Sequence, residues 1–447
     1  MDSGVTAWLL TSSALVFLMI PGLAFFYGGM NRSKSVLNML MMVVGALFIV
    51  GILWAIFGYS MAYGSTAGYF VGSFTDYFGL EAALAPPGEG DTFPTMVDVV
   101  FQAMFACLTV GLIAGALADR MKFGAWIIFA AVWASLVYFP VAHWVWGGGW
   151  IGELSIGDAG VIDFAGGTAV HINAGAAALA VCIILGKRRG WPKTPMRPHN
   201  LTMVMLGAGL LWFGWFGFNA GSAYAADNTA AIAATNTLLA TCAAGLAWLI
   251  VEKIRDKKAT SLGAASGIVA GLVAITPACA NVTPMGAILL GLVAGAVCAW
   301  AVTLKYKLGF DDSFDVVGIH LVGGLVGTLA LGFLASDLVE EGGQNGLLYG
   351  GDLNLLIVQI IAAAGVMVYS LILAGIIALA LKATTGIRSD EEDEVNGIDV
   401  AEHAETAYEL GDSGAGGAFA GVGQAARAKD RKSTPAELQS PDHLVCR

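Results

Sequence analysis

Two histidines lie within runs of apolar residues that are long enough to cross a membrane. One is His171, in the segment 163–173, and the other is His320, in the segment 314–320. An ionisable side chain at that depth is costly unless it is neutral or paired, which makes it a functional candidate. Because burial disfavours the charged imidazolium, both rings are predicted to stay neutral at pH 7. Each neutral ring then offers one donor and one acceptor to a small polar molecule or a proton.

The elements that must position these rings are membrane-spanning helices. Of the 447 residues, 57% are hydrophobic and only 12% are charged, whereas a soluble domain carries about 25% charged residues. Apolar runs of about the 20 residues that a helix needs to cross the hydrocarbon recur along the chain. The eleven predicted spans are 6–30, 39–64, 96–119, 123–145, 164–186, 200–223, 230–252, 262–281, 285–304, 314–336 and 354–384. The predicted fold is therefore an all-α polytopic membrane protein with eleven transmembrane helices, whose transmembrane domain covers residues 1–384.

The basic residues predict how these helices are oriented. All 22 Lys and Arg lie in alternate loops or toward the C-terminal end, within 32–34, 120–122, 187–197, 253–258 and 305–307 and from 382 onward. The other loops contain acidic residues and no basic ones. By the positive-inside rule the N-terminus is expected outside and the C-terminus inside. The expected location is the plasma (inner) membrane.

The two histidine-bearing spans are the fifth and the tenth, so they occupy matching places in two groups of five. Because five is odd, the second group must run inverted relative to the first, and such repeats place a site near the bilayer midplane. At 1.5 Å per residue, His171 lies roughly 12 Å from the outer end of its span, and His320 roughly 9–10 Å from the inner end of its own. A structural hydrogen bond between helices is the alternative for either ring.

Aromatic side chains cluster toward the outer ends of the spans. The cluster comprises Phe101 and Phe105 on one helix face, Trp215, Phe218 and Ser222 on another, and Trp146 at the end of the fourth span. Aromatic faces beside a hydroxyl can hold a small monovalent cation by cation–π attraction. An interfacial aromatic belt or core packing is the alternative, including for the deeper Phe105 and Phe218.

Asp163 begins the span that contains His171, so capping of the helix N-terminus is its plainest predicted role. It could also favour a cation electrostatically from behind the aromatic cluster. No metal site is expected, because no further Cys, His or carboxylate accompanies the histidines at their depth. The glycines at 147–149 follow no strand, so no nucleotide loop is supported, and neither a cofactor, an enzymatic activity nor a nucleic-acid partner is expected. The six cysteines form no CxxC pair, and five lie in the spans, where buried reduced thiols are predicted.

The character of the chain changes after residue 385. An acidic run over 389–394 is followed by a short polar stretch that ends near residue 410. From residue 411 the chain is rich in Gly, Ala and Ser and has too little apolar surface to fold, so residues 411–447 are predicted to be a disordered tail.

The segments that carry these residues resemble the signature motifs of the ammonium transporter (Amt/Mep/Rh) family. The resemblance rests on the segments 101–107, 142–149, 163–173, 214–222, 276–279 and 311–320 and extends from about residue 6 to residue 408. It implies a homotrimer in membrane lipid that handles ammonium or ammonia.

The resemblance also implies a role for each candidate residue. The outer ammonium recruitment site would be formed by Phe101, Phe105, Trp146 and Ser222, with Asp163 behind it. Phe105 and Phe218 would be a stacked phenyl gate, and His171 and His320 the pore pair, with Trp215 and Thr276 as pore-lining neighbours. Residues 385–410 would be a cytoplasmic regulatory region that binds a PII-type signal protein through a stretch containing Gly397, Asp399, His403 and Tyr408.

The expected function is that of an ammonium transporter. The cation would be recruited outside and lose its proton at or past the phenyl gate, and ammonia would cross along the two histidines. Two alternatives stay open: an ammonium sensor (transceptor) that acts through its C-terminal region and a partner protein, and a gas channel for ammonia or carbon dioxide as in the Rh branch.

Overall fold

The structure, a computed structural model, describes residues 1–339 and 342–408 and consists almost entirely of helices. Its α-helices are α1 Ser3–Met30, α2 Val36–Leu53, α3 Tyr59–Tyr63, α4 Thr95–Ile113, α5 Phe123–Trp133, α6 Phe139–Trp146, α7 Asn173–Leu185, α8 Leu201–Gly221, α9 Asn228–Arg255, α10 Ser261–Ile275, α11 Pro284–Ala301, α12 Leu304–Leu308, α13 Val322–Leu334, α14 Leu353–Thr384 and α15 Glu391–Asn396. Two short hairpins, β1 Thr66–Ala67 with β2 Val71–Gly72 and β3 Ser155–Ile156 with β4 Ala159–Gly160, are antiparallel.

Short π-helical and 3-10 segments continue or connect these helices. The π-helical segments are η1 Trp54–Gly58, η5 Ala134–Tyr138, η6 Gly167–Ile172, η7 Val317–Leu321 and η9 Asp399–His403. The 3-10 segments are η2 Phe78–Leu80, η3 Ala82–Leu84, η4 Ala114–Ala116 and η8 Leu347–Tyr349. Both histidine-bearing segments, η6 and η7, are π-helical, a form often found at functional sites.

Within the described residues, ten helices are long and apolar enough to cross a membrane. The expected span at 262–281 corresponds to α10, a shorter apolar helix that ends at Ile275. The sequence prediction was too long here because the apolar run continues through residues 276–281, where the chain turns instead of continuing the helix. The first and last spans agree within a few residues with α1 and α14.

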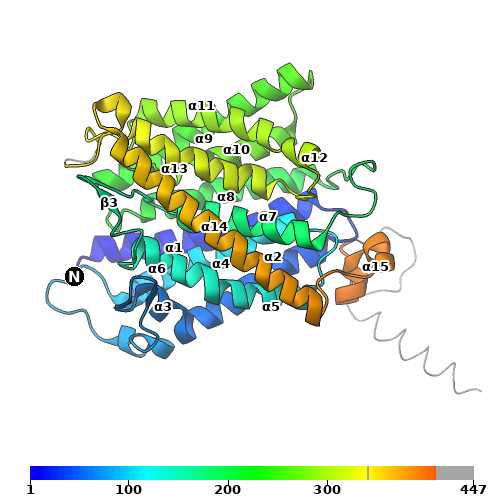
Figure 1. Cartoon of the computed structure of the whole chain (residues 1–447), viewed down its shortest axis with the longest axis horizontal. Helices are drawn as coiled ribbons and strands as arrows, with labels where there is room; N and C mark the ends of the chain where they lie inside the picture. The colour runs from blue at the N-terminus through cyan, green and yellow to red at the C-terminus, as the bar shows by residue number, and fades with distance from the viewer. Residues whose placement is uncertain (340–341, 409–447) are drawn as a thin grey trace, which may run out of the picture.

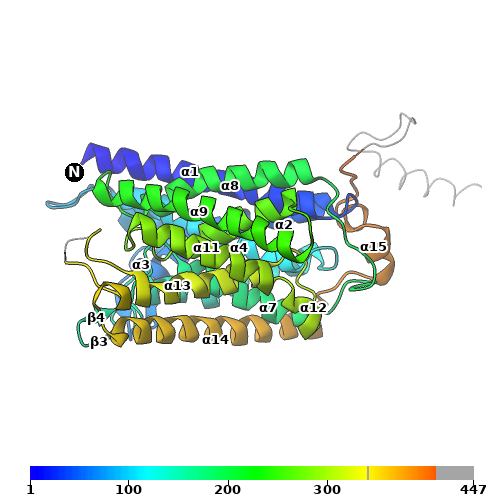
Figure 2. The same ribbon diagram turned by 90° about the horizontal axis from the view of Figure 1, so that it is seen from above.

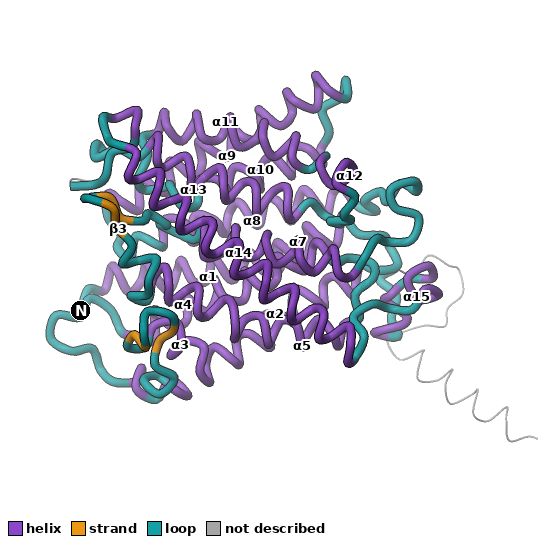
Figure 3. The backbone as a smooth tube through the Cα atoms, viewed as in Figure 1, coloured by secondary structure: helices purple, strands orange, loops and turns teal. Residues whose placement is uncertain are grey.

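The long helices lie side by side as one bundle (Figure 1). Seen from above, α1 and α8 run along one face of the bundle and α14 along the opposite face (Figure 2). In Figure 1, α14 crosses diagonally over α13 and α7. The strands are confined to one end of the bundle, with the N-terminus, and α12 and α15 lie at the other end (Figure 3).

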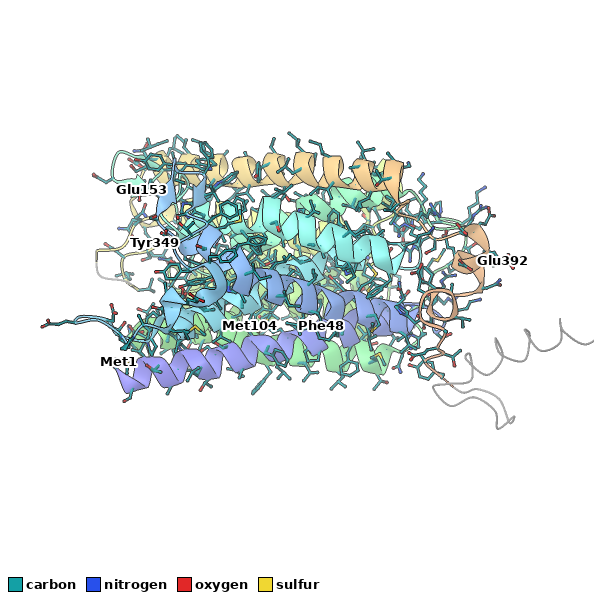
Figure 4. All side chains as sticks on the ribbon, turned by 90° about the horizontal axis from the view of Figure 1, so that it is seen from below. Met1, Phe48, Met104, Glu153, Tyr349 and Glu392 are labelled. Atoms are coloured by element: carbon teal, nitrogen blue, oxygen red, sulfur yellow. The ribbon has the colours of Figure 1, made fainter. Side chains whose placement is uncertain are left out.

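Charged and apolar side chains are separated along the bundle. Glu153 and Glu392 lie at opposite ends, and Phe48 lies between them (Figure 4). The Phe48 side chain is 61% exposed, and many other apolar side chains on the outer faces of the helices are exposed as well. Charged side chains at the two ends and exposed apolar side chains between them are the pattern of a bundle whose long axis crosses the hydrocarbon layer.

Small residues allow the helix backbones to approach closely. A Cβ atom on Gly291 would lie 2.2 Å from the carbonyl oxygen of Ala240, and one on Gly295 would lie 2.2 Å from that of Ala244. Glycines four residues apart on α11 therefore pack directly on the backbone of α9, as small residues do between helices in lipid.

The cysteine prediction holds for four of the five described cysteines. Cys107, Cys182, Cys279 and Cys298 are free and buried, whereas Cys242 is free and exposed. The prediction was wrong for Cys242 because hydropathy alone does not tell the outward face of an apolar helix such as α9 from its inward face. Cys446 and the predicted tail at 411–447 lie outside the described residues.

Candidate functional site

The two histidines predicted to pair are adjacent in the middle of the bundle. The Nδ1 atoms of His171 and His320 are 3.3 Å apart, and the ring centroids are 5.3 Å apart with 29° between the planes. Both side chains are buried, at 0% and 3% exposure. At this distance one Nδ1 donates to the other, and the tautomers decide which. A neutral pair therefore needs no charged partner at Nδ1, whereas His171 Nε2 is buried and has no hydrogen-bond partner among the described residues.

Aromatic rings extend this pair toward the outer end. The His171 ring stacks on Trp215, with centroids 5.5 Å apart, and on Phe218 at 6.1 Å. The Trp215 Nε1–H donates to the Thr276 hydroxyl at 2.9 Å, which in turn donates to the Leu272 carbonyl. The indole is thus fixed in orientation beside the imidazole.

Phe105 and Phe218 form a stacked pair above the histidines. Their centroids are 4.1 Å apart with 27° between the planes, and both side chains are buried. Burial of this kind places both rings inside the bundle, so neither belongs to an interfacial aromatic belt. Phe101 packs edge-on to Phe105 at 5.0 Å, and Trp146 does so at 6.3 Å.

A cavity of about 680 Å³ lies directly outside the ring pair. Phe105, Trp146 and Ser222 contribute to its wall. Phe101 is fully buried and lies behind Phe105, so of the four predicted recruitment residues it is the one that does not line this cavity. The Ser222 hydroxyl donates to the Phe218 carbonyl and keeps its lone pairs for another donor.

Asp163 is held at the start of η6 by a dense set of hydrogen bonds. Its carboxylate accepts from the backbone N–H groups of Gly166, Gly167, Thr168 and Ala169 and from the Thr168 hydroxyl. The carboxylate thus caps the N–H groups at the start of η6, as predicted, although the N-cap position itself is occupied by Gly166. The backbone carbonyl of Asp163 also accepts from Trp146 Nε1 at 3.0 Å, which connects the cap to the outer cavity.

A second capping carboxylate, Asp312, occupies the matching place before η7. It accepts from the N–H groups of Val316 and Val317, at 3.1 and 2.7 Å. The sequence argument noticed an Asp upstream of each histidine but did not single out Asp312. The equal interval of eight residues, from 163 to 171 and from 312 to 320, is the signal that identifies it. Burial raises the pKa of the Asp312 carboxyl above its usual value, against the opposing charge of Lys305.

A carboxylate in the outer cavity was also missed. Asp98 and four tyrosines, Tyr59, Tyr63, Tyr77 and Tyr224, line the same cavity as Trp146. The available signal was a carboxylate inside the predicted span 96–119, one helical turn before Phe101.

The C-terminal region packs against the start of α2, at the end of the bundle away from the N-terminus (Figure 3). The Asp399 carboxylate accepts from the N–H groups of Leu37 and Asn38, and His403 Nε2 lies 3.0 Å from the Asn38 side-chain oxygen. Burial raises the pKa of the Asp399 carboxyl, while the two N–H groups act in the opposite direction.

Two more residues of the predicted regulatory stretch contact the loop before α2 and the loop before α8. The Tyr408 hydroxyl lies 2.8 Å from His199 Nε2. Gly397 has φ +118°, and a Cβ atom there would lie 2.5 Å from the Lys34 carbonyl, so only glycine fits this contact.

Comparison with known proteins places this arrangement in a family. The sequence model of the Ammonium Transporter Family matches residues 7–408. An ammonium transporter of Mycobacterium tuberculosis is 56% identical over 437 residues, which cover 92% of this chain and 91% of the relative.

Solved structures agree with the sequence match. The crystal structure of Saccharomyces cerevisiae Mep2 has a TM-score of 0.81 and 32% identity, and the match covers 88% of each chain. A structure described as a Sensor Amt Protein has a TM-score of 0.81 at 28% identity, covering 90% of this chain and 98% of that one. Sequence and fold thus lead to one conclusion, that the chain belongs to the ammonium transporter family.

Proposed function

We propose that this ammonium transporter recruits ammonium in the outer cavity, removes one proton and conducts ammonia along His171 and His320. The observation that carries the proposal is the continuous column of rings from the cavity to the histidines. Trp146 and Ser222 line the cavity, the Phe105–Phe218 pair closes its inner side, and the histidine pair follows.

Desolvation explains why such a column selects ammonia. A cation that leaves water for an apolar, buried path loses far more hydration energy than a neutral molecule does. Ammonium can avoid this cost by giving up a proton, whereas potassium, of similar size, cannot. The imidazole nitrogens replace hydrogen bonds that ammonia loses on entering, and they are also a route for the released proton.

The test is substrate selectivity after loss of one ring of the pair. In reconstituted vesicles, His320→Ala is expected to admit potassium or methylammonium or to abolish ammonium flux, because the path loses its paired imidazole. His199→Ala, which removes an imidazole at the inner loops, is the matched control and is expected to keep selectivity. Unchanged flux and selectivity in His320→Ala would contradict the proposal.

The proposed topology has eleven spans, with α10 as the short eighth one. Two inverted groups of five and a final α14 would place the N-terminus outside and the C-terminus inside the plasma membrane. The matched carboxylate–histidine intervals before η6 and η7 support the repeat. Labelling of single cysteines placed at Asp91 and at Lys193 from either side of sealed cells would test the orientation.

We further propose that the chain assembles as a homotrimer and that residues 385–410 bind a PII-type signal protein. The contacts of Asp399 and His403 with α2 support a link between this region and the transmembrane helices. Residues 411–447 would be a separate tail. Mass measurement in detergent tests the trimer, and capture of purified PII protein by full-length but not truncated chain tests the partner.

An ammonium sensor is the second candidate, favoured by the same tail contacts and by the likeness to the Sensor Amt Protein. Ammonium uptake by a chain ending at residue 384 separates the two. If this truncated chain still takes up ammonium, the C-terminal region is not needed for transport and has a regulatory role only. If uptake is intact but ammonium signalling is lost, the chain also acts as a sensor. Absence of any ammonium-evoked current on a supported membrane would instead favour a gas channel.

A further inference from the structure

The outer cavity contains a carboxylate that the recruitment of ammonium at Trp146 and Ser222 does not use. Asp98 lies on the first turn of α4, and its side chain, together with those of Tyr59, Tyr63, Tyr77 and Tyr224, lines the cavity of about 680 Å³. Asp98, Gln102 and Phe105 follow the i, i+4, i+7 spacing of one helix face. The carboxylate is therefore about 10 Å along α4 from the phenyl pair, at 1.5 Å per residue.

Hydroxyl groups hold the Asp98 carboxylate in a fixed position. Tyr59 donates to one carboxylate oxygen at 2.8 Å and Tyr224 to the other at 2.5 Å. Gln102 donates to the Tyr224 hydroxyl at 2.7 Å, which fills an acceptor position on that oxygen. A carboxylate has about four lone-pair sites, so each Asp98 oxygen retains capacity to bind a cation.

The charge of Asp98 has no counterpart among the residues that the structure describes. Among the described residues, no Lys, Arg or His forms an ion pair with it, and no basic residue lines the cavity. A charge that is partly removed from water is costly unless it is paired. Hydrogen bonds from two phenols reduce this cost but leave the net charge in place. A cation that enters through the cavity would supply the missing counter-charge.

Neighbouring groups suit a small monovalent cation. The Tyr63 hydroxyl is buried and has no hydrogen-bond partner among the described residues, although the ring lines the cavity. The Tyr59 ring centroid lies 5.3 Å from that of Tyr63 and 5.1 Å from that of Tyr77, so several aromatic rings lie close to the carboxylate that Tyr59 contacts. Carboxylate and phenol oxygens combined with ring faces attract ammonium or potassium alike.

From these contacts we infer a second, outer cation site formed by Asp98, Tyr63 and the rings of Tyr59 and Tyr224, which concentrates monovalent cations one step before the Trp146–Ser222 site. The inference rests on the proposed function, because it assigns the site to the entry path of the same substrate. The site does not discriminate ammonium from potassium. Discrimination belongs to the deeper, drier part of the path, so potassium competes here without being transported.

Initial transport rates against ammonium concentration provide the first test. Asp98→Asn keeps the size and one acceptor of the side chain but removes the charge. It is expected to raise the half-saturating ammonium concentration about fivefold, the worth of one contact between unit charges in a water-filled cavity, and to leave the maximal rate unchanged. Potassium chloride should inhibit the wild type competitively and the variant less.

Three further variants separate a binding role from a structural one. Asp91→Asn removes a charge from the exposed rim of the same cavity and is expected to change half-saturation less than twofold. Tyr59→Phe keeps the charge and the ring but removes one of the two hydroxyls that hold the carboxylate, and it is expected to lower the affinity less than Asp98→Asn does. Asp98→Glu restores the charge and is expected to recover most of the loss. An equal effect of Asp91→Asn, or no rescue by Glu, would overturn the inference.

Direct observation of a cation keeps the test independent of flux. Anomalous scattering from crystals soaked in thallium(I), a heavy monovalent cation, is expected to show a site beside Asp98 in the wild type. This site should be missing in Asp98→Asn, whereas any density beside Trp146 should remain. No thallium beside Asp98 in the wild type overturns the inference but leaves the proposed ammonia path intact. Conversely, failure of the His320→Ala test would not remove a thallium site at Asp98.

Discussion

The hydrogen bond between Trp215 and Thr276 decides how the indole stands beside His171. Thr276→Val keeps the shape of the side chain but leaves the buried indole N–H without an acceptor, which costs about 1–3 kcal/mol of unfolding free energy. A lower unfolding temperature in detergent, followed by tryptophan fluorescence, is expected for Thr276→Val. Thr276→Ser keeps the acceptor and should stay near the wild type, and equal stability of the Val and Ser variants would contradict this account.

The Asp163 carboxylate is the most heavily hydrogen-bonded side chain of the site. Asp163→Asn leaves a single acceptor oxygen for donors from four backbone N–H groups and one hydroxyl, so several buried donors lose their partner. We expect a loss of several kcal/mol in unfolding free energy and a sharp fall in the yield of folded protein. The exposed Asp158→Asn is the control, and its yield and unfolding temperature should match the wild type.

For single residues, the sequence predicted which side chains belong to the site better than it predicted which side chains contact one another. The histidine pair was predictable because an ionisable residue is rare within an apolar span. Capping by Asp163 was predictable because Asp is favoured at the start of a helix. The Asp98–Tyr59–Tyr224 network was not. Tyr59 lies in a five-residue helix and Tyr224 in the loop after α8. No periodic pattern in the sequence predicts that these two side chains lie next to Asp98.

At the level of elements, the C-terminal region is tied to the start of α2. Asp399→Ala removes the acceptor for two N–H groups of α2, a capping loss of about 1 kcal/mol. Faster hydrogen exchange is expected in residues 391–408 and in the first turn of α2. The exposed Glu405→Gln should exchange like the wild type, and unchanged protection in the Asp399 variant would mean that other contacts hold the region.

The inner loops are joined by an ion pair that predicts acid sensitivity. Burial acts to raise the pKa of Asp311, but the hydrogen bonds and charge of Arg188 and the charge of Arg120 outweigh it and hold the pKa below its usual value. A carboxyl whose pKa is lowered by folding stabilises the folded state above its unfolded pKa, about 3.9, and loses this contribution as the pH falls further.

The unfolding temperature is therefore expected to fall steeply below about pH 4 in the wild type. Asp311→Asn should be less stable at pH 7, because Arg188 loses a charged partner at 2.9 Å, and its acid-induced decline should be shallower. Thermal unfolding between pH 7 and pH 3 measures both effects. Parallel pH profiles of the two proteins would show that this pair does not contribute.

Helix lengths were largely predictable, whereas helix types were not. Hydropathy located α8 and α14 within a few residues because it reports the length of an apolar run. It cannot report hydrogen-bond partners, so the π-helical form of η6 and η7 and the early end of α10 were missed. At the starts of η6 and η7 these partners include the carboxylates of Asp163 and Asp312, which lie a few residues earlier in the chain.

For the whole molecule, the proposed path from the outer cavity to the histidine pair is formed by residues of one chain. The rings of Phe105, Phe218, His171 and His320 contact one another directly, and no second copy is needed to complete them. Any oligomer should therefore contain one working path per chain.

Mixed assemblies test this independence. When wild type is co-produced with a transport-dead pore variant such as Trp146→Leu with His171→Ala, flux per vesicle is expected to rise in direct proportion to the wild-type fraction. Quantified affinity tags on the two chains give that fraction. A steep fall of flux with a minor share of variant would show coupling between paths.

The contact between Phe105 and Phe218 has a consequence for kinetics. Rings packed 4.1 Å apart leave no opening, so even a small molecule crosses only when the side chains briefly swing away from each other. Permeation would then occur in separate events, each limited by a fluctuation of the two side chains, and not as continuous flow through an open, water-filled channel. Because that swing needs extra volume in a tightly filled interior, hydrostatic pressure should slow it, and a smaller residue at position 218 should relieve the slowing.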